Sequence, residues 1–158
     1  MRRVTRMLPA ASWPAAERQA TVTLPWSERH RRRVRLHDDA GPPFLLDLER
    51  PVVLADGDGL LIDSGGVIAV VAAAEPVMEV KPDSAAEAAR FAWHLGNRHA
   101  PVQVLADGAL RLLDDPILAA MLRGLGAVVV QRQAAFAPEA GAYAALAQAE
   151  EGAGHDHL

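Results

Sequence analysis

Short apolar runs separated by turn residues fill the first half of the chain. The run at residues 33–36 alternates arginine with valine or leucine, which is typical of a strand with one buried and one solvated face. Asp-Gly and Ser-Gly-Gly sequences separate the later runs. Strands are predicted at residues 21–24, 33–36, 44–48, 60–62 and 67–71. The pattern predicts a small all-β domain over residues 1–74.

After residue 76 the pattern changes to helices between strands. Ser84 and Glu87 have the spacing of a capping box, and Gly96 stands where that helix is expected to end. A second helix is expected to begin at Asp115 and to stop at Gly126. Strands are predicted at residues 77–80, 101–105, 110–112 and 128–130. This order, βαββαβ, predicts a ferredoxin-like domain over residues 75–143.

The last residues, 144–158, are small and polar and are punctuated by glycine. They are expected to form a flexible tail that carries His155 and His157. The predicted fold class is therefore α+β, with an all-β domain, a ferredoxin-like domain and this tail.

Composition narrows the possible chemistry. The chain has 158 residues, 51% of them hydrophobic, and no cysteine, which excludes disulfides, thiolate metal sites and cysteine nucleophiles. Its six histidines are then the strongest ligands for a transition metal. No Walker, dinucleotide or Gly-x-Ser-x-Gly motif is present, and no nucleophile stands beside a base. We therefore expect no enzymatic activity, no catalytic residue and no bound organic cofactor.

No apolar run approaches the ~18 residues that cross a bilayer, and Arg2 and Arg3 are not followed by the apolar region of a signal peptide. We expect a cytoplasmic protein without a membrane partner.

Charge is unevenly distributed. Residues 1–36 carry a formal net charge of +7 and residues 37–158 carry −11. The run at residues 29–35 contains no aromatic side chain for stacking on bases, so a nucleic-acid partner is not expected. It fits a solvated sheet face or a patch for an acidic protein surface.

The most distinctive stretch is the predicted helix-to-strand loop that ends in His99. One imidazole is a poor metal site, but a two-fold dimer with this loop near its axis would supply two. His155 and His157 could add donors from the tail. A lone loop histidine can equally be a surface residue, and the terminal pair can occur by chance. A weaker alternative is a phosphohydrolase that uses Asn97 and Arg98.

Several motifs occur together. The loop reads Trp93-His94-Leu95-Gly96-Asn97-Arg98-His99, and later segments read Met121-Leu122-x-x-Leu125-Gly126 and Phe136-x-Pro138-Glu139-x-Gly141-Ala142-Tyr143. The first half contains Asp47-Leu48-x-Arg50 and Leu54-x-Asp56-Gly57-Asp58. Together these motifs, which span nearly the whole chain, resemble the UreE family of urease accessory proteins.

The resemblance implies a homodimeric nickel metallochaperone that delivers Ni(II) during urease maturation, with the urease accessory GTPase and the apo-urease maturation complex as partners. It implies that His99 is the ligand shared at the dimer axis and that His155 and His157 represent the family's histidine-bearing C-terminus. The short tail favours roughly one ion per dimer. Zn(II) or Cu(II) can occupy the same imidazoles, since Cu(II) binds them more tightly than Ni(II). The alternative function is that of a metal-independent peptide- or protein-binding assembly factor that uses the all-β domain.

Overall fold

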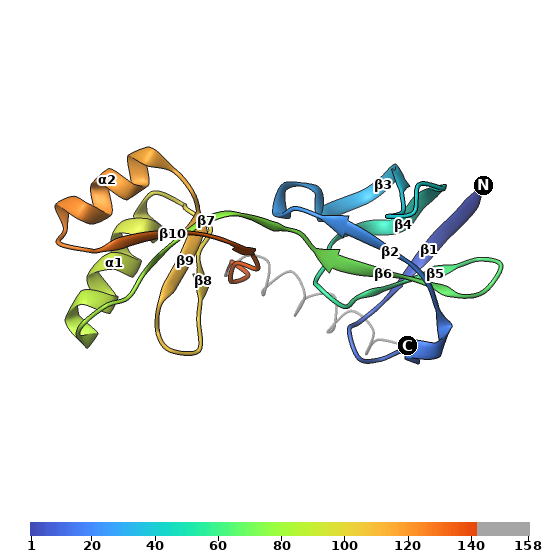
Figure 1. Cartoon of the computed structure of the whole chain (residues 1–158), viewed down its shortest axis with the longest axis horizontal. Coiled ribbons are helices and arrows are strands. Elements are labelled where there is room, and N and C mark those ends of the chain that lie inside the picture. The colour runs from blue at the N-terminus through green and yellow to red at the C-terminus, as the bar shows by residue number, and fades with distance from the viewer. Residues whose placement is uncertain (142–158) are drawn as a thin grey trace, which may run out of the picture. The chain divides into compact units, whose positions relative to one another are not determined.

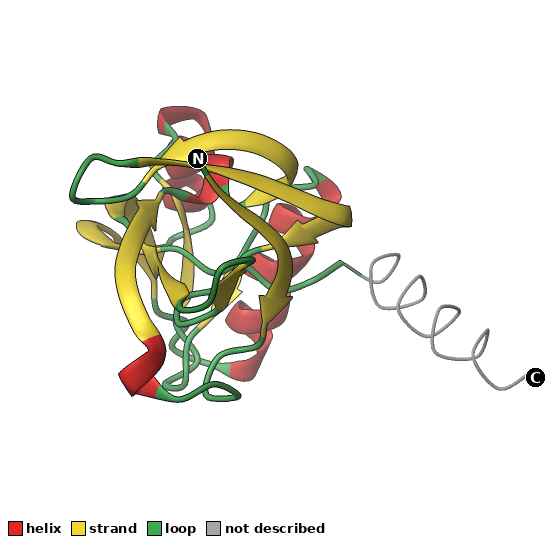
Figure 2. Cartoon of the chain, turned by 90° about the vertical axis from the view of Figure 1, so that its right-hand side faces the viewer, coloured by secondary structure: helices red, strands yellow, loops and turns green. Residues whose placement is uncertain are grey.

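The computed structural model describes residues 1–141, which form two compact units (Figure 1). Figure 2 distinguishes their helices, strands and loops by colour. The first unit comprises Met1–Val77 and Arg132–Ala137, and the second comprises Met78–Gln131 and the chain from Pro138 onward. The predicted tail, with His155 and His157, lies outside the described residues.

The first unit is built on a six-stranded sheet with the strand order β2-β6-β5-β1-β4-β3. Its strands are β1 (Arg2–Leu8), β2 (Arg18–Leu24), β3 (His30–His37), β4 (Pro43–Val53), β5 (Gly59–Ile62) and β6 (Val67–Ala72). Two short 3-10 helices, Ala15–Glu17 and Trp26–Glu28, flank β2. The predicted all-β region is confirmed, and the strand β1 is an addition to it.

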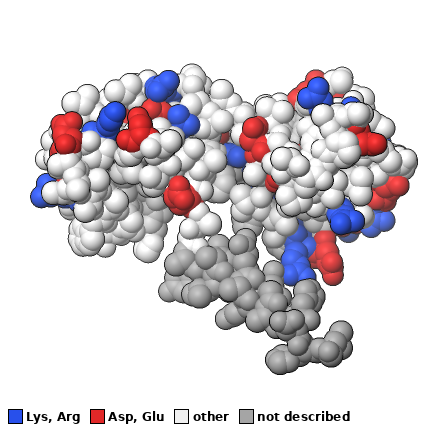
Figure 3. Space-filling model, turned by 90° about the horizontal axis from the view of Figure 1, so that it is seen from below, with Lys and Arg blue, Asp and Glu red and all other residues white. Residues whose placement is uncertain are grey.

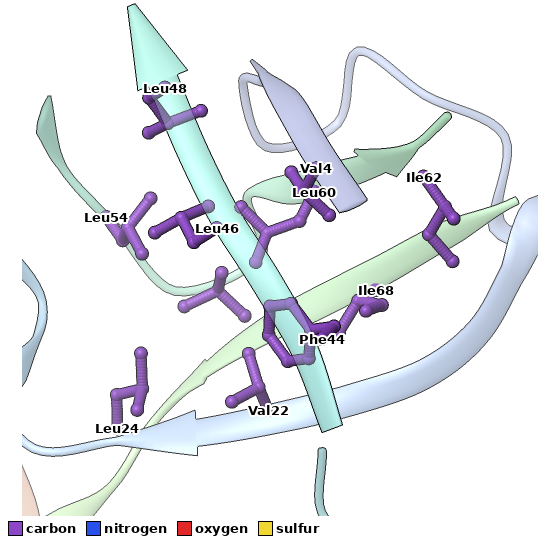
Figure 4. Packing of buried hydrophobic residues seen from close by; sticks show 11 residues of the cluster. Val4, Val22, Leu24, Phe44, Leu46, Leu48, Leu54, Leu60, Ile62 and Ile68 are labelled. Carbon is purple, nitrogen blue, oxygen red and sulfur yellow. The ribbon is translucent and has the colours of Figure 1, made fainter. Parts of the chain in front are cut away.

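The core of this unit follows from alternation along β4. Phe44, Leu46 and Leu48 point to the same side and are buried (Figure 4). Val22 and Leu24 of β2 belong to the same core, although β2 and β4 are far apart in the strand order. The sheet is therefore curled, so that one of its faces closes around a common interior.

The second unit has a four-stranded sheet with the order β10-β7-β9-β8, which is the strand order of the predicted ferredoxin-like fold. The elements that contribute to it are β7 (Ala74–Val80), α1 (Ala85–Asn97), β8 (Gln103–Val104), β9 (Leu110–Leu113), α2 (Pro116–Gly124) and β10 (Val129–Ala135). The first residues of β7, up to Val77, and the last residues of β10, from Arg132, belong to the first unit. Strand β8 is shorter than predicted, and β10 continues beyond the predicted valines.

Both helices pack on one face of this sheet. Met78 and Val80 alternate on β7 and share one core with Phe91 and Leu95 of α1 and Leu122 of α2. The same core fixes where α1 ends, and this end carries the candidate site.

Candidate functional site

Helix α1 begins as the sequence predicts, with one difference. The Ser84 hydroxyl accepts a hydrogen bond from the Glu87 amide at 3.1 Å, which satisfies an otherwise unpaired amide of the first turn. The Glu87 carboxylate, however, accepts from the Asp83 amide at 3.1 Å. Only the serine half of the capping box is therefore present.

The end of α1 differs from the prediction. The helix runs through Gly96 to Asn97, and His99 adopts the left-handed conformation expected of a terminating glycine, with φ of 55°. The His99 amide donates to the Gly96 carbonyl at 3.0 Å, and the Ala100 amide donates to the Leu95 carbonyl at 3.1 Å. These two bonds make a Schellman motif with His99 at its left-handed position. The prediction that Gly96 terminates the helix is wrong.

Helix α2 ends in the same motif with a glycine. The Gly126 amide donates to the Arg123 carbonyl at 3.0 Å and the Ala127 amide to the Leu122 carbonyl at 3.0 Å, with φ of 91° at Gly126. His99 therefore occupies a backbone position that glycine fills in the neighbouring helix. Because the motif fixes the backbone on both sides, the loop presents the histidine from a defined point.

The His99 side chain is free to act as a ligand. It is exposed, and it makes no hydrogen bond, ion pair or ring contact with any of residues 1–141. Neither ring nitrogen is committed to a protein partner, so the neutral imidazole can bind a metal through one of them.

Two aromatic rings lie one turn before the loop. The Trp93 indole is 63% exposed and contacts the partly buried His94 ring edge to face, with centroids 4.9 Å apart. Trp93 and Asn97 are four residues apart and so share one face of the helix. Tryptophan is enriched at protein interfaces, so this exposed indole is a candidate contact residue beside the loop.

The described residues do not form a complete ion site. Residues 1–141 contain no group of three or more histidine, aspartate or glutamate side chains placed to hold a metal ion. His30 and His37 lie at the two ends of β3 in the first unit, and the His37 ring is paired with the Gly41 carbonyl at 2.9 Å. His99 is thus a single donor within the described part of the chain.

A cavity of about 530 Å³ lies next to this loop, at Arg98. Its charged lining also includes Asp114 and Asp115, and its remaining lining is mostly apolar. Asp115 is engaged in capping α2, where its carboxylate accepts from the Ile117 amide at 2.8 Å. Two carboxylates beside Arg98 oppose a phosphate, which argues against the phosphohydrolase alternative.

Sequence reasoning missed a buried cationic cluster in the first unit. Arg29 is 1% exposed, its guanidinium lies over the Trp26 ring at 5.5 Å, and it donates to the Phe136 carbonyl. Phe136 is fully buried and meets Trp26 edge to face at 6.0 Å. Burial lowers the pKa of Arg29, while Glu75 and Asp56 act in the opposite direction. No local pattern links Arg29 to a carbonyl 107 residues away.

The predicted turn at Asp56 and Asp58 is present. Asp58 accepts hydrogen bonds from the Ala10 and Ala55 amides, and Asp56 accepts one from the Ala72 amide. These carboxylates hold backbone groups, as expected of a turn. Across residues 1–141, no helix has the length and apolar content needed to span a membrane.

Two family models match consecutive parts of the chain. Residues 4–73 match the family model of the UreE urease accessory protein N-terminal domain, and residues 75–158 match that of its C-terminal domain. Both matches agree with the order of the two sheets.

Individual relatives are similar over most of the chain. It is 47% identical to the urease accessory protein UreE of Rhodopseudomonas palustris strain BisB18 over 137 residues, which cover 87% of this chain and 63% of that protein. It is 43% identical to the protein of the same name from Beijerinckia indica, with 99% of this chain and 86% of the relative covered. For Rhizobium rhizogenes the identity is 42%, and 99% and 89% are covered.

The chain spans 63% of the length of the two Rhodopseudomonas palustris relatives. The matched regions nevertheless include both family domains in order, and the Beijerinckia and Rhizobium relatives are covered over more than four fifths of their length. The chain therefore belongs to the UreE family of urease accessory proteins.

Proposed function

We propose that this protein carries Ni(II) during urease maturation and that His99 is its central ligand. The observation that carries the proposal is the exposed, unpartnered imidazole of His99, held at a fixed helix end in a member of a urease accessory family. Such a family comprises accessory proteins and not enzymes, so the ion is cargo.

One imidazole per chain requires a partner. A two-fold homodimer with the two α1 ends near its axis would bring two copies of His99 together and supply two nitrogen ligands. The exposed Trp93 indole, one turn before the loop, is a residue type enriched at protein interfaces and so favours a protein contact at this end of the helix. His155 and His157, near the C-terminal end of the same chain, would add further imidazole ligands to the two copies of His99.

The same donor set accepts other metals. Zn(II) can occupy it, and Cu(II) should bind neutral imidazoles more tightly than Ni(II). Selection of nickel must then come from its supply and from the proteins that receive it. We also propose that the carrier works in the cytoplasm. The chain contains no cysteine, so its fold needs no disulfide and is compatible with a reducing compartment.

Transfer would proceed by exchange of ligands within a complex. The accessory GTPase and apo-urease are the partners that we propose for this step. Tail histidines could leave the ion first while the two His99 rings still hold it, so that at no stage is the ion released to water.

Equilibrium dialysis against Ni(II) tests the ligand. We would compare the unaltered chain, His99→Asn, His30→Asn as the matched control, and a chain that ends before His155. Asparagine tolerates the left-handed backbone of residue 99, so this change removes the imidazole without straining the loop. We expect about one ion per two chains in the unaltered and His30→Asn proteins and a loss of the tightest binding in His99→Asn. Unchanged stoichiometry and affinity in His99→Asn would refute the proposal.

Sedimentation velocity tests the dimer. The unaltered protein should sediment as a dimer, and Trp93→Ser should shift it toward monomer and weaken nickel binding in parallel. A protein that holds nickel with full affinity as a monomer would contradict the shared site.

A second function, that of a metal-independent peptide- or protein-binding assembly factor, is favoured by the arginine-rich strand β3. A variant in which all six histidines are replaced separates the two functions. If this variant supports urease activation at limiting nickel as well as the unaltered chain does, binding and not metal delivery is the function.

A further inference from the structure

Basic side chains are concentrated on three adjacent strands of the first unit. Figure 3 shows one face of the molecule, where basic and acidic side chains lie among one another. The strands of the first unit nevertheless differ in the charge that they carry. The neighbouring strands β1, β4 and β3 together contain eight arginines and only two carboxylates, Asp47 and Glu49. The chain as a whole has a net charge of −4, so these strands are a basic surface on an acidic protein.

Strand β3 is an edge of the sheet. It pairs with β4 on one side, and no strand formed by residues 1–141 pairs with its other side. An edge strand leaves alternate backbone N–H and C=O groups without ladder partners, which makes it a template for an added strand.

The side chains of β3 alternate between apolar residues on one face of the sheet and arginines on the other, and an added strand would lie beside both kinds. Val34 and Leu36 pack against the core but stay partly exposed, whereas Arg33 and Arg35 are exposed on the other face. The pairing with β4 is regular from Arg33 to His37, after a register shift between Arg31 and Arg33. About five residues of a partner could therefore pair along the edge, over roughly 17 Å.

The fold neutralises only part of the positive charge on this strand. Asp47 accepts a hydrogen bond from Arg3 at 2.6 Å and lies 3.8 Å from the Arg33 guanidinium. The pKa of Asp47 is lowered, chiefly by the bond from Arg3. Arg32 and Arg35 form no ion pair with any residue in the described part of the chain.

Two other occupants of the edge are disfavoured, the first by charge and the second by the lack of exposed aromatic side chains. A second copy of β3 would place arginines beside arginines, and like charges on neighbouring strands are destabilising. A single-stranded nucleic acid would lack stacking partners, because Phe44 is the only aromatic residue of β1, β3 and β4 and it is fully buried.

We propose that the free edge of β3 binds an extended acidic segment of a partner protein by strand addition. Backbone hydrogen bonds to β3 would supply the pairing, and the side chains would supply the selection. Carboxylates beside Arg33 and Arg35 on the outer face would alternate with apolar side chains beside Val34 and Leu36. The partner segment is therefore expected to alternate acidic and β-branched residues. This proposal rests on the second function given above, that of a peptide- or protein-binding factor, for which it names the surface and the chemistry of the partner. The surface is independent of His99, which lies in the other unit.

Fluorescence anisotropy with the full chain tests this proposal. The probe is a labelled peptide of alternating Glu and Val, and its controls are a peptide with Lys in place of Glu and one with the same residues in two blocks. The alternating acidic peptide should bind and the two controls should bind at least about tenfold more weakly. Methylation of alternate peptide nitrogens should also abolish binding in one of the two registers, because strand addition uses backbone N–H groups.

Charge reversal locates the site. Arg33→Glu with Arg35→Glu should weaken binding of the acidic peptide at least about tenfold, and should leave nickel dialysis unchanged. Arg90→Glu with Arg123→Glu, two exposed arginines of the second unit, changes the net charge equally and should leave peptide binding within about twofold. If the β3 double variant does not fold, Arg35→Gln alone should still weaken binding about threefold.

Hydrogen exchange provides an independent readout. Bound peptide should slow exchange of amides within His30–His37 and not in β5, which β1 and β4 separate from β3 in the strand order. Equal binding to both double variants, unchanged exchange in β3, or tighter binding of a single-stranded RNA that displaces the peptide would each overturn the proposal.

Discussion

Replacing His99 by glycine should stabilise the protein while removing its candidate ligand. A left-handed backbone costs a residue with a Cβ about 1–2 kcal/mol, and histidine tolerates it better than most. Glycine avoids this cost but loses about 0.4–1 kcal/mol through the greater freedom of its unfolded chain. The net gain for His99→Gly is about 0.5 kcal/mol, which corresponds to a rise in Tm of about 1–2 °C for a chain of this length.

The matched change is Gly126→His at the end of α2. Gly126 has the same two Schellman hydrogen bonds, and an added Cβ would meet nothing within 4 Å, so the substitution introduces backbone strain without a clash. It should lower the Tm by a similar 1–2 °C.

Thermal unfolding followed by circular dichroism would compare the two single variants, the double variant and the unaltered chain without added metal. The double variant should return close to the unaltered value, because the two sites are separate motifs. A lower Tm in His99→Gly, or no change in Gly126→His, would refute the account of the two helix ends.

Three further changes test other parts of the fold. Phe136→Ala should cost about 3–5 kcal/mol in urea unfolding because it empties a fully buried site, whereas Val128→Ala, at a side chain 79% exposed, should stay within about 0.5 kcal/mol. Asp115→Ala should cost about 1 kcal/mol by the same measurement, since its carboxylate caps α2, and no loss would contradict that role. The hydrogen bond from Arg2 lowers the pKa of Asp38, so this carboxylate stabilises the fold above its ordinary pKa of ~3.9 and the contribution disappears as the pH falls through the lower folded value. Asp38→Asn should therefore reduce the loss of urea stability between pH 7 and pH 3, and an equal loss in both proteins would exclude this explanation.

Elements with strong local signals were predictable from the sequence. Asp115 caps α2, and Gly126 ends it, because both residues act through their own side-chain or backbone chemistry. Strand β1 was missed because only Val4 of its seven residues is buried and a register shift after Val4 breaks the alternation. Three of its seven residues are arginines, which are unusual in a strand that lies in the interior of the sheet order.

The candidate site was predictable as a loop but not in its geometry. The segment before His99 contains Gly96, and glycine is the usual left-handed residue at a helix end. Packing of Leu95 into the core instead allows the helix to continue to Asn97, which moves the left-handed position to His99. The dependence of Arg29 on Phe136 could not be predicted, because only the folded chain brings these residues together.

The division of the chain also constrains how the protein can be cut. Residues 132–137 belong to the first unit although they follow most of the second in sequence. A fragment that stops at residue 74 would therefore lack Phe136, so the Trp26 ring would lose this aromatic neighbour and the Arg29 guanidinium would lose the Phe136 carbonyl as an acceptor. An N-terminal fragment cut at the boundary between the two family domains would be an incomplete folding unit. Low stability of that fragment would therefore not report the stability of the same residues in the intact protein.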